Sequence, residues 1–188
     1  MGKLQVFNFI TLNGYCKGSK EDISWHKQNA GEDEQDFASE GAQSGSMLLF
    51  GRTTYDMMSS FWPTEAAHHA MPKVADGMNK SDKIVFSRRL RKAHWNNTRI
   101  ISKNITDAVL KMKKEGKIMT ILGSGSIVSH FADAGIIDEY QFLLDPVAIA
   151  KGTTLFKGIK NELQLQLINS KVFKSGSILL CYTPRKNS

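Results

Sequence analysis

The spacing of apolar and polar residues predicts strands that alternate with helices along most of the chain. Short runs rich in β-branched and aromatic residues indicate strands, and stretches with helical spacing between capping residues and glycines indicate helices. Strands that alternate with helices pair in parallel, so the pattern predicts an α/β fold with a mixed, mostly parallel sheet flanked by helices. The expected strands are 4–10, 47–50, 83–86, 98–101, 117–122 and 139–144, and the expected helices are 31–40, 53–58, 105–115 and 125–134.

The C-terminal part of the chain follows a different pattern. Leu163, Leu165 and Leu167 alternate with glutamines, and a second strand-like run at 177–183 follows the turn at 174–176. Two such runs joined by a short glycine-containing turn predict an antiparallel hairpin that closes the sheet.

Several helix boundaries are expected from individual residues. The threonines after Arg52 are expected to cap one helix and Asn104 another, while Gly41 and Gly45 are expected to end the helix at 31–40. The region 63–79 has helical composition, but it contains Pro72 and Gly77 and is expected to be mixed helix and loop.

The length and composition favour one soluble domain spanning residues 1–188. The 188 residues are 41% hydrophobic and 23% charged, and no stretch approaches the roughly 18 apolar residues that span a bilayer. No signal peptide is evident at the N-terminus, and the only cysteines are Cys16 and Cys181, so we expect a cytoplasmic protein without disulfides or membrane partners. Adjacent His68 and His69 would diverge on a helix, so no metal site is expected.

The net charge of +7 leaves the class of partner open. The densest basic run is 88–92, followed by His94 and Trp95. Such a run suits nucleic acid, with Trp95 stacking on a base, or a phosphorylated small molecule, or it is a solvated loop.

A phosphate cradle is predicted at Gly123–Ser124–Gly125–Ser126, between a buried strand and a helix. Glycines let the backbone approach a ligand closely, and the free N–H groups of the next helix face negative charge. A full dinucleotide fingerprint would have a third glycine where Val128 stands, so a standard dinucleotide fold is disfavoured. A second strand–glycine–helix junction at Gly51–Arg52–Thr53 also suits an anion.

Together with the loop at Ser87–Arg88, these junctions lie where strands end, and open α/β sheets bind ligands at that edge. In order, the set resembles the dihydrofolate reductase superfamily, and more closely the reductase domain of bifunctional riboflavin-biosynthesis deaminase/reductases. The resemblance covers nearly the whole chain. The motifs that carry it are Thr11–Gly14, Leu48–Tyr55, Val85–Arg88, Ile121–Ser126, and Ala134–Glu139 followed by Pro146, Gly152, Leu155 and Phe156.

The resemblance implies NADPH as cofactor. It places Arg52 and Thr53, beside Gly51, at the pyrophosphate or the adenosine phosphates, and Ser87 and Arg88 at the 2′-phosphate. The cradle would bind the pyrophosphate from the other side, and the loop containing Leu12 and Gly14 would border the nicotinamide. A compact 2′-phosphate uses only one or two arginines of the basic run, so the resemblance favours the cofactor over nucleic acid.

The resemblance also implies a reductase that transfers a hydride to a small nitrogen heterocycle. The substrate would be like that of the riboflavin-pathway 5-amino-6-(5-phosphoribosylamino)uracil reductase, or a pterin or dihydrofolate. We expect Asp36 to orient or protonate the heterocycle. The expected substrate-binding residues are Tyr15, Trp62, Leu144 and Phe156. The alternative is a non-catalytic NADP(H)-binding or sensing protein of the same fold, and a homodimer is expected in either case.

Overall fold

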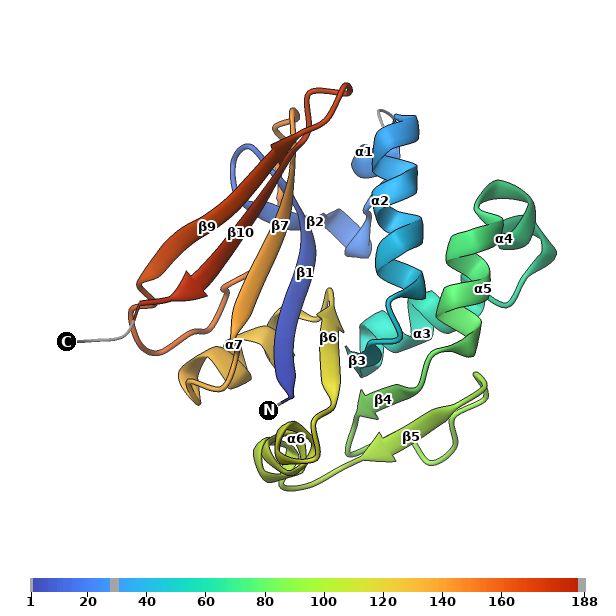
Figure 1. Cartoon of the computed structure of the whole chain (residues 1–188), viewed down its shortest axis with the longest axis vertical. Coiled ribbons are helices and arrows are strands. Elements are labelled where there is room, and N and C mark those ends of the chain that lie inside the picture. Colours follow the sequence, from blue (N-terminus) through green and yellow to red (C-terminus); the bar gives the residue numbers. More distant parts are fainter. Residues whose placement is uncertain (1, 28–30, 186–188) are drawn as a thin grey trace.

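A computed structural model describes residues 2–27 and 31–185, and its centre is an eight-stranded sheet (Figure 1). The strand order is β5-β4-β3-β6-β1-β7-β10-β9. The pairs from β5 to β7 are parallel, and β10 pairs antiparallel with β7 and β9, which confirms the predicted fold class. The strands are β1 (Lys3–Thr11), β3 (Met47–Gly51), β4 (Lys83–Phe86), β5 (Thr98–Ile101), β6 (Ile118–Leu122), β7 (Glu139–Asp145), β9 (Leu165–Val172) and β10 (Ile178–Pro184).

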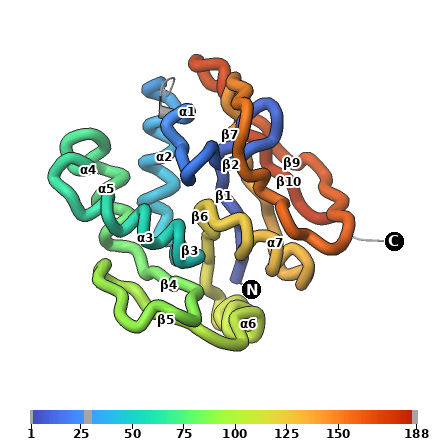
Figure 2. Tube along the Cα trace, turned by 180° about the vertical axis from the view of Figure 1, so that it is seen from behind, coloured from blue at the N-terminus to red at the C-terminus, as the bar shows by residue number. Residues whose placement is uncertain are grey.

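Helices cover both faces of the sheet because its strands carry apolar side chains on both sides. In β3, Met47 and Leu49 pack on the face covered by α6 and α7, whereas Leu48 and Phe50 pack on the face covered by α2, α3 and α5. The hairpin of β9 and β10 forms one side of the sheet, and β4 and β5 form the other (Figures 1 and 2). The helices are α2 (Glu32–Gln43), α3 (Arg52–Phe61), α4 (Glu65–Ala70), α5 (Pro72–Lys80), α6 (Ile105–Lys114) and α7 (Gly125–Asp133).

A second, two-stranded sheet was not predicted. It pairs β2 (Tyr15–Gly18) with β8 (Gly152–Thr154), and a 3-10 turn, η1 (Ser19–Glu21), and a short helix, α1 (Ser24–Lys27), follow β2. This small sheet joins the segment after β1 to the segment after β7. Because β1 and β7 are parallel, both segments leave the large sheet at the carboxyl ends of its strands, and the small sheet lies at that edge.

Some predicted helix boundaries were confirmed and others were wrong. Gly45, with a left-handed φ of 74°, follows the C-cap Ser44 and so lies at the predicted end of α2. Helix α2 continues through Gly41 to Gln43, and α3 begins at Arg52 with Gly51 as its N-cap, without a threonine side-chain cap. Asn104 is the N-cap of α6, but with a left-handed φ of 49° and no side-chain cap hydrogen bond. Pro72 starts α5, because proline lacks the N–H that the first helical turn leaves unpaired.

Gly77 lies inside α5 because the helix passes very close to α2. A Cβ built on Gly77 would lie 2.4 Å from the carbonyl oxygen of Ala42 in α2. Any larger residue would separate the two helices, which explains a glycine at a helical position where alanine is intrinsically favoured by about 1 kcal/mol.

None of the helices within the described ranges is both long and apolar enough to cross a lipid bilayer. The cytoplasmic location and the single-domain organisation stay predictions.

Lys83, the first residue of β4, is buried as a charge. It is 1% exposed, its Nζ donates to the carbonyl oxygens of Asn79 (3.2 Å) and Ser81 (2.5 Å), and it lies 4.7 Å from the centre of the Trp95 ring. Burial lowers the pKa of Lys83 from 10.5 to about 8, although nearby Asp82 opposes this shift. The folded protein therefore loses this proton at a lower pH than the unfolded chain does.

The free energy of unfolding is expected to rise with pH through this window. Above about pH 8 the unfolded chain binds more protons at Lys83 than the folded protein, so folding becomes more favourable, by about 2 kcal/mol between about pH 7.5 and about pH 9.5. Urea denaturation at the two pH values measures the change. Lys83→Met removes the titrating group and should lack this increment; an equal rise in both proteins would contradict the assignment.

Candidate functional site

The structure brings the three predicted anion-binding loops together at one edge of the sheet. They follow β4, β3 and β6, which are neighbours in the strand order and run in parallel. Ser87 and Arg88 follow β4, Arg52 starts α3 directly after β3, and the cradle 123–126 follows β6. The direction in which the chain adds strands also reverses here. It moves outwards from β3 through β4 to β5, and then places β6 between β3 and β1.

The cradle is a tight left-handed turn. Gly123 and Ser124 both have left-handed backbone, with φ values of 62° and 58°. This conformation is unfavourable for serine, but the buried Ser124 Oγ accepts a hydrogen bond from the N–H of Gly51 at 2.8 Å. The bond ties the cradle to the start of α3, so the first N–H groups of α7 and α3 lie near each other.

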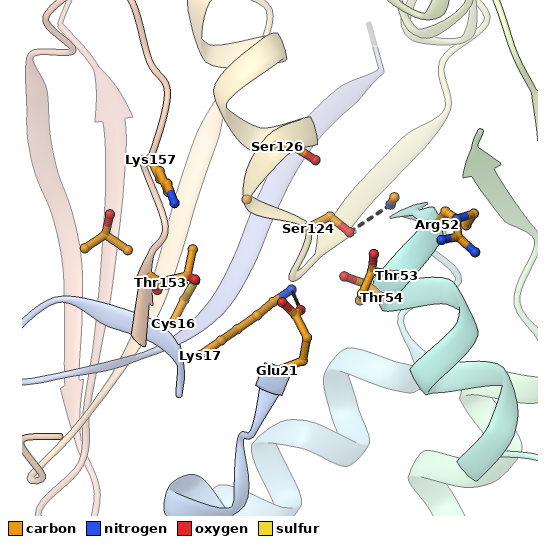
Figure 3. A pocket seen from close by; sticks show the side chains of 13 residues that line it. Cys16, Lys17, Glu21, Arg52, Thr53, Thr54, Ser124, Ser126, Thr153 and Lys157 are labelled. Carbon is orange, nitrogen blue, oxygen red and sulfur yellow. Dashed lines mark hydrogen bonds and ion pairs between the residues drawn. The ribbon is translucent and has the colours of Figure 1, made fainter. Parts of the chain in front are cut away.

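A cleft of about 270 Å³ opens between the cradle, the start of α3 and the small sheet (Figure 3). Lys17, Lys157 and Arg52 contribute positive charge to its lining, and Glu21 contributes the negative charge that pairs with Lys17. Ser126 and Lys157 point towards its centre, while Arg52 lies beyond Thr53 and Thr54 and pairs with Asp56 at 3.1 Å. The lining residues are Cys16, Lys17, Glu21, Gly51, Arg52, Thr53, Thr54, Ser124, Gly125, Ser126, Thr153, Thr154 and Lys157.

The small sheet forms a firm wall of this first cleft. Cys16 Sγ donates to the carbonyl oxygen of Thr153 at 3.3 Å, and burial raises the pKa of the thiol, which keeps it protonated as a donor. A Cβ on Gly125 would lie 3.0 Å from the carbonyl oxygen of Leu155, so the segment after β8 also rests on the cradle. Lys17, Glu21 and Lys157 were missed in the sequence because nothing in their local pattern marks the pairing of β2 with β8.

A second cleft, of about 580 Å³, lies between the ends of β4 and β5, the start of α6 and one side of α7. Arg88 and Lys103 contribute positive charge to its lining, and Asp107 contributes one negative charge. Ser87 Oγ accepts hydrogen bonds from the N–H groups of Arg89 (3.2 Å) and Leu90 (3.0 Å), which leaves its own O–H free to donate. Lys103 was missed, although it follows β5 at the same edge and the rule that located Arg88 would have found it.

The loop predicted to border a nicotinamide lies beside the small sheet rather than in either cleft. Leu12 is 62% exposed, Gly14 has a φ of 82° in the turn between β1 and β2, and neither lines the first or the second cleft. Tyr15 pairs with Thr154 across the small sheet, and its ring lies against Gly152.

The other predicted substrate-binding residues do not come together. Trp62 packs with the helices on one face of the sheet, where its Nε1 donates to Met58 Sδ at 3.1 Å. Phe156 packs on the opposite face, where its ring centre lies 6.0 Å from those of Tyr140 and Phe142. Leu144 follows Phe142 by two positions on β7 and so lies on the same side of that strand. Trp62 and Phe156 therefore lie on opposite faces of the sheet, and the substrate-binding roles of these residues stay predictions.

Asp36, the residue expected to orient or protonate the heterocycle, is exposed on α2. The buried carboxylate of this helix is Glu34, which is 4% exposed and whose Oε2 accepts from the Gly31 N–H at 3.0 Å. Its Oε1 is buried without a hydrogen-bond partner among the described residues, as is Oδ1 of Asp33. Glu34 is the third residue of α2 and supplies only its own half of a capping box, because the N-cap Gly31 has no side chain that could return a hydrogen bond.

The basic run 88–92 is exposed at its four charged residues, but Trp95 is not available to stack on a base. Trp95 is 5% exposed, its Nε1 donates to Asn79 Oδ1 at 2.7 Å, and its backbone N–H donates to the hydroxyl of Tyr55. Within residues 2–27 and 31–185, no group of three or more His, Cys, Asp or Glu side chains is placed to hold a metal ion.

Comparisons with known proteins agree with this geometry. Residues 2–179 match the family model described as the RibD C-terminal domain. Among curated proteins, YyaP of Bacillus subtilis is 26% identical over 92% of this chain and 90% of its own length, and it is described as uncharacterized.

Two solved structures share the fold. The "Putative riboflavin biosynthesis protein" of Shewanella sp. PV-4 has a TM-score of 0.79 at 18% identity, with 98% of this chain and 99% of that chain covered. The dihydrofolate reductase of Enterococcus faecalis, complexed with NADP(H), has a TM-score of 0.65 at 13% identity, with 98% of each chain covered. These findings confirm the resemblance to the dihydrofolate reductase superfamily and to its riboflavin-biosynthesis branch. The chain belongs to the RibD C-terminal domain family.

Proposed function

We propose that this protein is an NADPH-dependent reductase acting on a small, planar nitrogen heterocycle. The observation that carries the proposal is that the three loops predicted to bind anions lie at one edge of the sheet, beside two clefts whose linings carry cations. A dinucleotide with a 2′-phosphate has negative charge at two separate places, and the two clefts offer cations and N–H donors at two separate places.

The donor groups of each cleft fit one part of the cofactor. In the first cleft, Ser126 and the N–H groups at the starts of α3 and α7 suit a pyrophosphate, with Arg52 and Thr53 at its rim. In the second cleft, the free hydroxyl of Ser87, the guanidinium of Arg88 and the neighbouring Lys103 suit the 2′-phosphate. The loop of Leu12, Gly14 and Tyr15 is then our proposal for the nicotinamide end.

When bound, NADPH supplies the hydride, and the chain's own residues align the reactants and provide the proton side of the reaction. We assign to Glu34 the role that the sequence suggested for Asp36. Its buried, unpaired Oε1 can accept a hydrogen bond from a heterocycle N–H. The exposed carboxylate of Asp36 is the weaker candidate, because water already solvates it. A pyrimidine such as 5-amino-6-(5-phosphoribosylamino)uracil, or a pterin, presents such N–H groups.

Arg88→Ala is expected to weaken NADPH binding by about 1 to 3 kcal/mol, which is roughly 5- to 150-fold. The physical reason is the loss of a charge-assisted contact to the 2′-phosphate. NADH lacks that phosphate, so its affinity should barely change. Fluorescence titration of the wild type and the variant with both dinucleotides measures the effect. Equal, weak binding of NADPH and NADH by the wild type would argue against the assignment.

The alternative function is an NADP(H)-binding or sensing protein without turnover. It is favoured by the separation of two predicted substrate residues, since Trp62 packs on one face of the sheet and Phe156 on the other. Oxidation of NADPH measured over a panel of pyrimidines and pterins distinguishes the two functions. A protein that binds NADPH tightly yet oxidises it with none of them is a sensor.

We also infer that two copies of the chain associate through β9. This strand is the outer edge of the sheet, and Leu167, Ile168 and Val172 on it are 49%, 52% and 70% exposed. An uncovered edge with apolar side chains invites pairing with another strand. Light scattering is expected to give roughly twice the chain mass of 21.0 kDa, and Val172→Lys should give the single mass. A wild type that is monomeric at all concentrations would end this inference.

A further inference from the structure

A carboxylate of the protein itself reaches into the cleft that suits a pyrophosphate. Glu21 lines the first cleft and pairs there with the ammonium group of Lys17, close to the cradle (Figure 3). The side chain of Lys17 is 15% exposed and that of Glu21 is 49% exposed. The pair therefore lies at the mouth of the cleft, with the lysine on the inner side.

The backbone that carries Glu21 is strained. Lys20 and Glu21 have left-handed φ values of 57° and 65°, a conformation that residues with a Cβ rarely adopt. The turn is held at its two ends, because the N–H of Gly18 donates to the Asp22 carbonyl at 2.7 Å and the N–H of Asp22 donates to the Ser19 carbonyl at 3.3 Å. Such strain persists only where the surroundings over-determine it, and it gathers at ligand clamps and switches.

Lys17 is anchored much more firmly than Glu21. It belongs to β2 and is paired with Thr153 of β8, and Gly152 of β8 packs so closely that a Cβ there would lie 2.2 Å from the Lys17 carbonyl oxygen. If the pair is broken, the backbone of Lys17 stays fixed by β8. Glu21 lies instead on a turn held by hydrogen bonds within 18–22, and this turn can move the carboxylate outwards.

We propose that Glu21 is a built-in competitor for the pyrophosphate, and that Lys17 is the cation shared between them. The proposal rests on the proposed function and deepens it. In the free protein Glu21 neutralises Lys17. A bound pyrophosphate repels the carboxylate, takes over the ammonium group and releases the turn at 19–22 from its strained conformation. Part of the binding free energy is spent on breaking the existing ion pair, so Glu21 lowers the affinity for the cofactor.

The test is calorimetric titration of NADPH, and separately of inorganic pyrophosphate, into the wild type and three variants. Glu21→Gln should bind both ligands roughly three- to tenfold more tightly, and Lys17→Gln should bind both about tenfold more weakly. Glu32→Gln is the matched control, because it removes the same charge from an exposed position on α2 outside the cleft. Its affinities should equal those of the wild type. Thermal melting checks that each variant is folded.

Hydrogen exchange provides a readout that does not depend on affinity. Ligands normally slow exchange where they bind, and the cradle amides should follow that rule. The amides at 19–22 should instead exchange faster when NADPH is bound, because the turn is released. In Glu21→Gln they should exchange fast with or without the ligand.

The outcomes separate this inference from the proposed function. Wild-type protein that binds NADPH while Glu21→Gln binds it no more tightly than Glu32→Gln overturns the inference alone. Binding of pyrophosphate but not of NADPH, with tighter binding by Glu21→Gln, supports the competitor and contradicts the proposed cofactor. A wild type that binds neither ligand contradicts both.

Discussion

Replacing Ser126 with aspartate is expected to weaken NADPH binding by about 100-fold or more, which is roughly 2.7 kcal/mol, while the protein remains folded. Ser126 is exposed, lines the first cleft and is the second residue of α7. A carboxylate at a helix N-terminus stabilises the helix, so the fold does not suffer. The same carboxylate repels the pyrophosphate that the proposed function places there.

Ser126→Asn is the matched control for this prediction, because it has nearly the shape of aspartate without the charge. It should bind NADPH within a few-fold of the wild-type affinity, and fluorescence titration of both variants gives the comparison. Should Ser126→Asp retain wild-type affinity, the pyrophosphate cannot lie at the start of α7.

Asp138→Ala is expected to cost roughly 2 to 3 kcal/mol of stability, the largest effect we predict on folding; the side chain of Asp138 is 41% exposed, but that of its partner Lys113 is only 10% exposed. Asp138 Oδ2 accepts from the Leu4 N–H at 2.8 Å, and its Oδ1 accepts from Lys113 Nζ at 2.9 Å. Lys113 is 8% exposed and also donates to the Ile136 carbonyl at 3.0 Å. Without Asp138, a buried ammonium group loses its counter-charge and the start of β1 loses a partner.

Urea denaturation measures this loss, and the neighbouring carboxylate provides the control. Glu139 pairs with Lys3, whose side chain is 42% exposed, so Glu139→Gln should cost less than about 1 kcal/mol. Adding Lys113→Met to Asp138→Ala should recover part of the stability, because the unpaired charge is then removed. Similar losses for Asp138→Ala and Glu139→Gln would show that burial of Lys113 does not matter.

The regular part of the fold was predictable because each element carries its own pattern. The strands β4 and β5 have the predicted bounds, since each is a short apolar run between polar turns. The cradle was recognisable because glycines and small polar residues between a strand and a helix have few other uses. The location of the three loops at one edge of the sheet was predictable from the parallel pairing of β4, β3 and β6.

What could not be predicted depends on contacts between distant segments. The strands β2 and β8 have four and three residues and show no alternation of their own, so only their mutual pairing makes them strands. The exposure of Asp36 and the burial of Glu34 depend on how α2 is rotated against the sheet. That rotation is fixed in part by the turn of the C-terminal hairpin, where the Lys174 N–H donates to Asp33 at 3.0 Å.

The pairing of β2 with β8 also bears on how the protein is made. The contact between Cys16 and Thr153 spans 137 positions, and Lys157 lies further still along the chain. Cys16 is synthesised before the cradle and Thr153 and Lys157 after it, so the wall of the first cleft is incomplete until the last two residues have emerged from the ribosome. A dinucleotide therefore cannot bind at the complete first cleft while the chain is still being translated. Products truncated before residue 157 likewise gain no protection from proteases by binding it at this cleft.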